Sequence, residues 1–159
     1  MSSVRFVFPK PRLAKLLRMP GGLPVPEALE QAEANLATIR PTCVAELDSL
    51  LAQAEARFEA LGSGPDDAGM ADIYAIAVRG IGGGEVCRLP GVDVALTSLC
   101  DLIDHLRSDG RCDRPAIGVH LRAWRLLMSA ELPAAGSAVL LDGLRQVSAR
   151  YARTAAPAD

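Results

Sequence analysis

The chain has 159 residues, of which 50% are apolar and 23% are charged, with a formal net charge of -2. These values fit one folded domain, exclude a chain that is disordered throughout, and give no overall electrostatic footprint for nucleic acid. Aromatic residues are scarce, and a core of Leu, Ala, Ile and Val favours packed helices over a β-sandwich. No apolar run approaches the roughly 18 residues of a membrane span, and we expect a cytoplasmic protein without membrane insertion.

Residues 1–24 form a basic, proline-containing stretch that reaches the Gly21-Gly22 pair near its end. Its five basic residues have no acidic counterpart there: Arg5, Lys10, Arg12, Lys15 and Arg18. We expect a tail that lies loosely on the domain. Contact with a membrane surface or an acidic partner is the alternative that these charges would support. The expected organisation is this tail, a helical domain over 25–153, and a C-terminal tail over 154–159.

Two amphipathic patterns follow the tail. Apolar residues recur at three- and four-residue spacing from Val25 to Ile39, and we expect this first helix to end at Pro41. A second apolar stripe runs over 44–61 and is stopped by the Gly- and Pro-containing segment 62–65. The pattern therefore predicts two separate helices on either side of the proline.

Four further helices are expected at about 66–80, 90–110, 113–133 and 140–151. Asp66, Asp67 and Asp113 are the expected N-terminal caps, and glycines at 80–84 should weaken the end of the first of these helices. The pattern predicts an all-α fold. We expect an antiparallel four-helix bundle built from the longest helices, with the helix from Val25 packed across it as an additional N-terminal helix.

The remaining polar groups give no sign of a metal or cofactor site. The four cysteines contain no CxxC pair and are expected to act as small hydrophobic residues: Cys43, Cys87, Cys100 and Cys112. The glycine cluster lacks the GK[ST] ending of a nucleotide-binding loop. Asp101 and Asp104 resemble an ordinary solvated edge of their helix. No catalytic or metal role is expected for the carboxylates of this region: Asp93, Asp101, Asp104 and Asp109. We therefore expect no metal, no cofactor and no enzyme activity.

Residues 73–84 read IYAIAVRGIGGG and resemble the signature helix of histidine-phosphotransfer (Hpt) domains. The closer likeness is to the stand-alone Hpt proteins of α-proteobacteria, because Pro90 and the SLCDLI stretch at 98–103 fall on the next family motifs. Three other segments resemble the remaining family helices: 27–33, 119–125 and 141–145. The resemblance covers nearly the whole chain. It implies an Hpt-type bundle in bacterial two-component signalling, with a response-regulator receiver domain or a histidine kinase as partner.

The departures from the family motif fall on its polar positions. The resemblance puts Val78 in the place of the phosphoacceptor histidine, exposed and midway along the bundle. The family's acid, lysine and glutamine fall on Arg79, Ile81 and Gly83. Valine has no lone pair with which to attack an aspartyl phosphate, so the relay chemistry is absent at this position. We therefore expect a pseudo-Hpt protein that binds its partner without phosphotransfer.

An apolar patch is expected where a partner of this family docks. Tyr74, Val78 and Ile81 share one helix face at i, i+4 and i+7. The core-facing set should then be Ile73, Ile76, Ala77 and Gly80. The expected partner-binding residues are Tyr74, Val78, Arg79, Ile81, Gly82, Gly84 and Glu85. The alternative is that Val78 and Ile81 fill the core of a slightly rotated helix.

Two other functions remain open. A phosphorelay carrier would need a displaced acceptor, and the only histidines are His105, expected to be half-exposed, and His120, expected to be a partly buried structural residue. A helical dimerisation module without a signalling role is the other alternative, and it would make the protein a homodimer.

Overall fold

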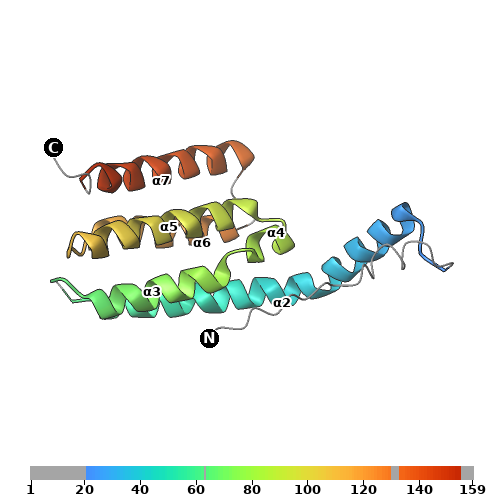
Figure 1. Cartoon of the computed structure of the whole chain (residues 1–159), viewed down its shortest axis with the longest axis horizontal. Helices are drawn as coiled ribbons and strands as arrows, with labels where there is room; N and C mark the ends of the chain where they lie inside the picture. The colour runs from blue at the N-terminus through green and yellow to red at the C-terminus, as the bar shows by residue number, and fades with distance from the viewer. Residues whose placement is uncertain (1–20, 63, 130–132, 155–159) are drawn as a thin grey trace, which may run out of the picture. The chain divides into compact units, whose positions relative to one another are not determined.

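The computed structural model describes residues 21–62, 64–129 and 133–154. The five basic residues of the expected tail and most of the expected C-terminal tail lie outside the described residues. All regular secondary structure in the described ranges is helical, which confirms the all-α class (Figure 1). The helices are α2 (Val25–Ala60), α3 (Asp67–Gly80), α4 (Gly83–Cys87), α5 (Pro90–Ser108), α6 (Arg114–Met128) and α7 (Ala134–Thr154).

Helix α2 continues through Pro41, where we expected one helix to end and another to begin. Proline has no amide proton, so the carbonyl of Ala37 receives no helical hydrogen bond from position 41. The residues on both sides are mostly good helix formers, and the helix continues despite this missing bond. The prediction of two helices is therefore wrong. The chain does divide into two compact units between Ala37 and Thr38, within the turn that precedes the proline.

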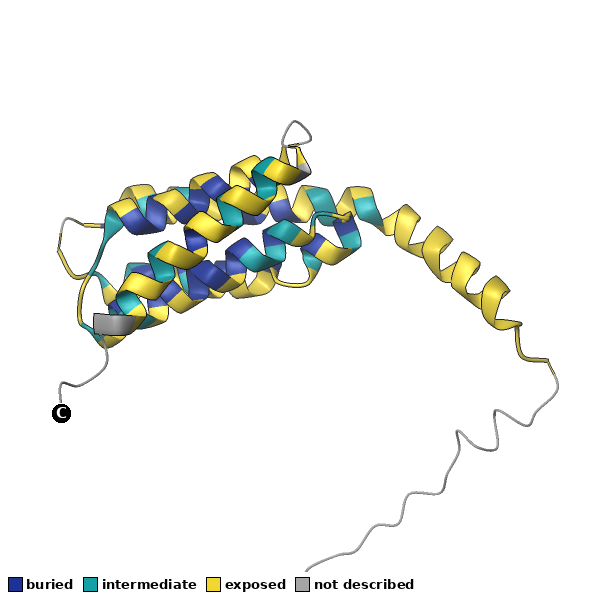
Figure 2. Ribbon diagram, turned by 90° about the horizontal axis from the view of Figure 1, so that it is seen from above, coloured by how far each residue is buried: buried dark blue, intermediate teal, exposed yellow. Residues whose placement is uncertain are grey.

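The first half of α2 buries none of its side chains. Every residue from 21 to 39 is exposed, including the large apolar residues Val25, Leu29 and Leu36 (Figure 2). We expected this stretch to pack its apolar face across the bundle, and this stays a prediction, because residues up to Ala37 belong to a separate unit of the chain.

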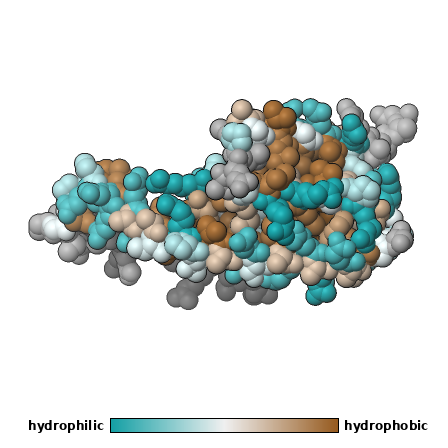
Figure 3. Space-filling model, turned by 180° about the vertical axis from the view of Figure 1, so that it is seen from behind, coloured by the Kyte–Doolittle hydropathy of each residue, from teal (hydrophilic) through white to brown (hydrophobic). Residues whose placement is uncertain are grey.

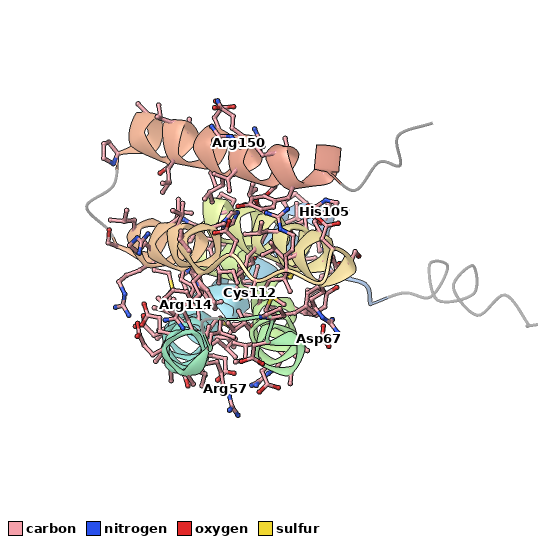
Figure 4. The ribbon with its side chains drawn as sticks, turned by 90° about the vertical axis from the view of Figure 1, so that its left-hand side faces the viewer. Arg57, Asp67, His105, Cys112, Arg114 and Arg150 are labelled. Atoms are coloured by element: carbon pink, nitrogen blue, oxygen red, sulfur yellow. The ribbon has the colours of Figure 1, made fainter. Side chains whose placement is uncertain are left out.

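The second unit has one apolar core, organised around α5. This helix contacts α3, α4, α6 and α7, and buried side chains lie on most of its circumference. Leu47, Leu50, Leu51 and Ala54 from the second half of α2 join the same core. Figures 1 and 4 show α7 on one side of α5 and α6, with α3 and the second half of α2 on the other. Among the described helices, none is both long and apolar enough to cross a membrane.

Two aspartates begin helices as the sequence predicted. Asp66 accepts a hydrogen bond from the Gly69 amide (2.9 Å) at the start of α3, and Asp113 accepts one from the Ala116 amide (3.1 Å) at the start of α6. The second carboxylate oxygen of Asp113 accepts a hydrogen bond from the Tyr151 hydroxyl of α7 (2.6 Å). Burial and this hydrogen bond raise the pKa of Tyr151 to about 12, so the hydroxyl stays protonated as a donor.

Arg114 of α6 makes a cation–π contact with Phe58 of α2. The guanidinium of Arg114, labelled in Figure 4, lies 4.9 Å from the centroid of the Phe58 ring and donates a hydrogen bond to the Leu61 carbonyl. This hydrogen bond supplies a donor to the Leu61 carbonyl at the C-terminal end of α2, where the helix itself provides none.

Candidate functional site

Helix α3 presents the face that the sequence predicted. Ile73 and Ala77 are fully buried and Ile76 nearly so, whereas Val78 is 45% exposed and Ile81 is 43% exposed. Tyr74 is half-buried and packs against the edge of the core. The alternative, in which Val78 and Ile81 fill the core of a rotated helix, is therefore wrong. We give the name Val78 surface to the half-buried Tyr74 together with five exposed residues, Val78, Arg79, Ile81, Gly82 and Glu85.

Val78 lies near the end of its own helix. It is in the last turn of α3, which ends at Gly80, and its expected place midway along the bundle stays a prediction. The amide of Ile81 still donates to the Val78 carbonyl (3.3 Å), and the chain then leaves the helix. The backbone of Gly82 has φ +92°, a left-handed conformation that glycine adopts without strain. The glycine sequence thus ends the helix just beyond Val78.

Two glycines near this surface are required by packing. A Cβ at Gly80 would lie 2.9 Å from Leu96 Cδ1, so the absence of a side chain lets α3 approach α5 closely. A Cβ at Gly84 would lie 2.7 Å from the Leu89 carbonyl oxygen and 2.9 Å from Asp93 Cγ. Gly84 is buried, so its expected role in partner binding is wrong: it lies beneath the surface instead.

One carboxylate holds the turn that carries this surface. Asp93 Oδ1 accepts hydrogen bonds from the amides of Gly82 (2.9 Å) and Gly84 (3.0 Å), and Oδ2 accepts one from the Glu85 amide (2.9 Å). These amides lie at the start of α4, where the helix itself offers no acceptors. This structural role of Asp93 was not predicted from the sequence. An acid in the first turn after Pro90, next to a glycine run, was the signal in the sequence.

The charged residues of the Val78 surface are only loosely held. Arg79 pairs with Glu46 of α2 (3.2 Å), and both side chains are more than half exposed. Exposed pairs of this kind contribute about 0–1 kcal/mol, so Arg79 can exchange this partner for another carboxylate. The side chain of Glu85 is exposed beside it. The surface therefore combines an apolar centre with a movable basic group and an acidic group at its edge.

His120 is buried and fully hydrogen-bonded. Its Nδ1 lies 3.0 Å from the Ala116 carbonyl oxygen, and its Nε2 lies 3.1 Å from Ser98 Oγ. Since a carbonyl only accepts, Nδ1 carries the proton and Nε2 accepts from the Ser98 hydroxyl. Burial lowers the pKa of His120 and so favours this neutral form. The expectation of a structural histidine is confirmed, and burial is more complete than expected. His105 is half-buried, near the end of α5.

A groove of about 440 Å³ lies between α5 and α7, above this histidine. Its lining residues are Asp93, Val94, Thr97, Ser98, Asp101, Arg145 and Ser148. Ser148 Oγ lies 2.8 Å from Ser98 Oγ, so hydroxyl groups form the polar floor of the groove and link the two helices. Within the described ranges, no group of three His, Cys, Asp or Glu side chains is placed to hold a metal ion.

The four cysteines are unpaired, and the structure gives no nucleophilic thiolate among the three with a shifted pKa. Burial raises the pKa of Cys87 and Cys112, and it raises that of Cys100 to about 11. Thiols with these pKa values are protonated near neutral pH and are weak nucleophiles. The interpretation of these residues as small hydrophobic side chains therefore agrees with their surroundings.

Comparison with known proteins identifies no relative of this chain. The chain matches no family model, no curated protein and no solved structure. The function must therefore be argued from the residues themselves.

Proposed function

We propose that the chain is a pseudo-Hpt protein, in which an antiparallel bundle of α3, α5, α6 and the second half of α2 binds a signalling partner without phosphotransfer. The partner is a response-regulator receiver domain or the dimerisation helices of a histidine kinase. The observation that carries the proposal is the exposure of Val78 and Ile81 on an otherwise well-packed helix. Exposed large apolar side chains next to each other mark interaction surfaces more often than isolated ones do.

The geometry around Val78 favours binding over catalysis. The three amide contacts of Asp93 fix the backbone beside the surface, so little conformational entropy is lost when a partner docks. The imidazole of His120 is buried and uses both ring nitrogens in hydrogen bonds. A protein of this kind would compete with active phosphotransfer proteins for a shared receiver, or hold a kinase in one conformation.

Binding should depend on Val78 and not on apolar exposure in general. We expect Val78→Asp to weaken binding of the partner at least tenfold, because it would desolvate a carboxylate at the centre of the contact. Val119→Asp is the matched control, since Val119 on α6 is 38% exposed and receives the same new charge. Calorimetry of each variant with the receivers and kinase domains of the same organism measures the effect. Equal weakening by both variants, or no partner at all, would count against the proposal.

A gain of function gives a second, independent test. If a receiver docks with its phosphorylated aspartate near position 78, Val78→His combined with Ile81→Lys should accept the phosphoryl group. The imidazole nitrogen forms the new P–N bond as the aspartyl P–O bond breaks, and the aspartate leaves as a carboxylate. We expect labelled phosphohistidine in this variant and none in the wild type or in Val119→His. Label on the wild type that is lost in His105→Ala would replace the proposal with a displaced acceptor.

A further inference from the structure

The groove between α5 and α7 is lined by two opposite charges that do not pair with each other. Arg145 of α7 and Asp101 of α5 both line this groove of about 440 Å³. Neither side chain makes a hydrogen bond or an ion pair with any residue that the structure describes. Groups of this kind, placed at a groove of ligand size, are available to fix the orientation of a bound molecule.

The register of the two helices is defined at two places. Helices α5 and α7 run in the same direction, as the colours of Figure 1 show. Ser98 Oγ lies 2.8 Å from Ser148 Oγ, 50 positions further along the chain. A Cβ at Gly91 would lie 3.6 Å from Cδ1 of Leu141, a residue that is also 50 positions further along. Residues 50 positions apart therefore lie side by side along this part of the two helices.

This register places the two charges at different levels of the groove. Arg145 lies level with Ala95, which is six residues before Asp101 in α5. The rise of an α-helix puts positions six residues apart about 9 Å from each other along the helix axis. A ligand that contacts both side chains must therefore carry its charges several bonds apart. A free amino acid, whose charged groups share one carbon, spans too little of this distance.

The floor between the two charges accepts hydrogen bonds. His120 Nδ1 carries the proton, so Nε2 accepts from the Ser98 hydroxyl (3.1 Å). The Ser98 proton is thereby used, and Ser148 donates its own proton to Ser98 Oγ. The Ser148 oxygen keeps lone pairs for a donor in the groove. Asp93 also lines the groove, but its oxygens already accept three amide hydrogen bonds, which leaves Asp101 as the carboxylate for a cation.

Polar groups, rather than exposed apolar ones, distinguish this groove. Hydrophobic residues reach the surface among hydrophilic ones on the face drawn in Figure 3, as is usual for folded proteins. The groove instead presents, in order along its length, a cation, a hydrogen-bond acceptor and an anion. A short peptide with free termini presents the complementary groups in order: a carboxylate, a backbone N–H and an ammonium group. Three extended residues span about 10 Å, which matches the separation of the charges.

We propose that the groove between α5 and α7 binds a short linear peptide of about three residues with free termini. The peptide carboxylate lies at Arg145, whose planar guanidinium suits a carboxylate, and the ammonium group lies at Asp101. A peptide N–H donates to Ser148 between them. This proposal goes beyond the proposed function, because it uses neither the Val78 surface nor a signalling partner.

Calorimetric titration of the full chain with triglycine tests the proposal. We expect saturable binding of one triglycine per chain. Three probes should bind about tenfold more weakly or worse, because each loses hydrogen bonds to a charged group. These probes are glycine, acetyl-triglycine, which lacks the ammonium group, and triglycine amide, which lacks the carboxylate.

Variants of the two charged residues test the position of the site. Arg145→Gln and Asp101→Asn should each weaken triglycine binding about tenfold or more. Both side chains are exposed, so these variants should fold as the wild type does. Arg150→Gln and Asp104→Asn are the matched controls and should keep the wild-type affinity. Each removes the same charge from an exposed residue of the same helix that does not line the groove.

Other outcomes overturn the proposal. No saturable binding of triglycine or trialanine at millimolar concentrations would show that the groove is not a peptide site. Equal affinity for triglycine and its amide would leave a cation site that does not use Arg145. Equal affinity for triglycine and acetyl-triglycine would leave an anion site that does not use Asp101. Equal weakening by the control variants would show a general effect of charge on binding.

Discussion

Asp93→Ala is expected to lower the free energy of unfolding by about 3 kcal/mol, because hydrogen bonds to a charged group contribute about 1.5–3 kcal/mol each and water replaces part of what is lost. The carboxylate of this residue accepts from three backbone amides. For a chain of this size the loss corresponds to a fall in melting temperature of about 6–12 °C. Thermal and urea unfolding of the variant measure it.

Two further variants distinguish the loss of the three Asp93 hydrogen bonds from a general effect of removing a charge. Asp101→Ala removes an exposed carboxylate from the same helix and should change stability by less than about 0.5 kcal/mol. Asp93→Asn should fall between the two. The asparagine keeps the oxygen that accepts hydrogen bonds from the Gly82 and Gly84 amides. Its NH₂ group, however, is a donor and faces the Glu85 amide, which is also a donor. If Asp93→Ala and Asp101→Ala unfold at the same denaturant concentration, the three Asp93 hydrogen bonds contribute nothing to stability.

Acidification is expected to destabilise the protein through His120. Burial lowers the pKa of this histidine in the folded state below its ordinary value of 6.5. Between these two pKa values the unfolded chain binds more protons than the folded one, so stability falls as the pH decreases below about 6.5. The loss has a limiting slope of about 1.4 kcal/mol per pH unit and ends once the pH is below the folded-state pKa. Urea unfolding at a series of pH values from 7.5 down to 5 measures this slope.

The second histidine supplies the control for this pH dependence. His120→Gln is expected to be less stable at neutral pH, because it leaves part of the Ser98 and Ala116 hydrogen bonding unmade, but its stability should vary less between pH 7.5 and 5. His105→Gln should keep the full wild-type slope, since His105 is only half-buried. A wild-type slope that survives in His120→Gln and disappears in His105→Gln would contradict the assignment.

Much of the helical architecture follows from local patterns in the sequence. Asp66 and Asp113 cap α3 and α6, Pro90 begins α5, and the stripe around Leu99 is buried, because these features depend on neighbours close in sequence. Pro41 was misinterpreted for a physical reason. A proline inside a helix costs about 3 kcal/mol, through the missing hydrogen bond and the clash of its ring with the preceding turn, and a long segment with good helix formers on both sides can tolerate this.

The candidate site was only partly predictable. The exposed face of Val78 follows from helical periodicity alone, because it requires only that Ile73 and Ala77 point to the core. The buried state of Gly84 and the role of Asp93 depend on α4 and α5 meeting in space, and no pattern within a single helix contains that information. The same holds for His120, whose hydrogen bond to Ser98 joins residues 22 positions apart.

The attachment of α7 has a consequence for partial unfolding. Among the described side chains of this helix only Leu144 is fully buried. Four others are partly buried against the core, Leu140, Leu141, Val147 and Tyr151, and the Asp113–Tyr151 and Ser98–Ser148 hydrogen bonds add polar contacts. A segment with a single fully buried side chain opens at a lower free energy than the global transition. We therefore infer that α7 is the first cooperative unit of the bundle to detach. Its departure would bring solvent to Ser98, and through it to the imidazole of His120, while α5 and α6 remain folded.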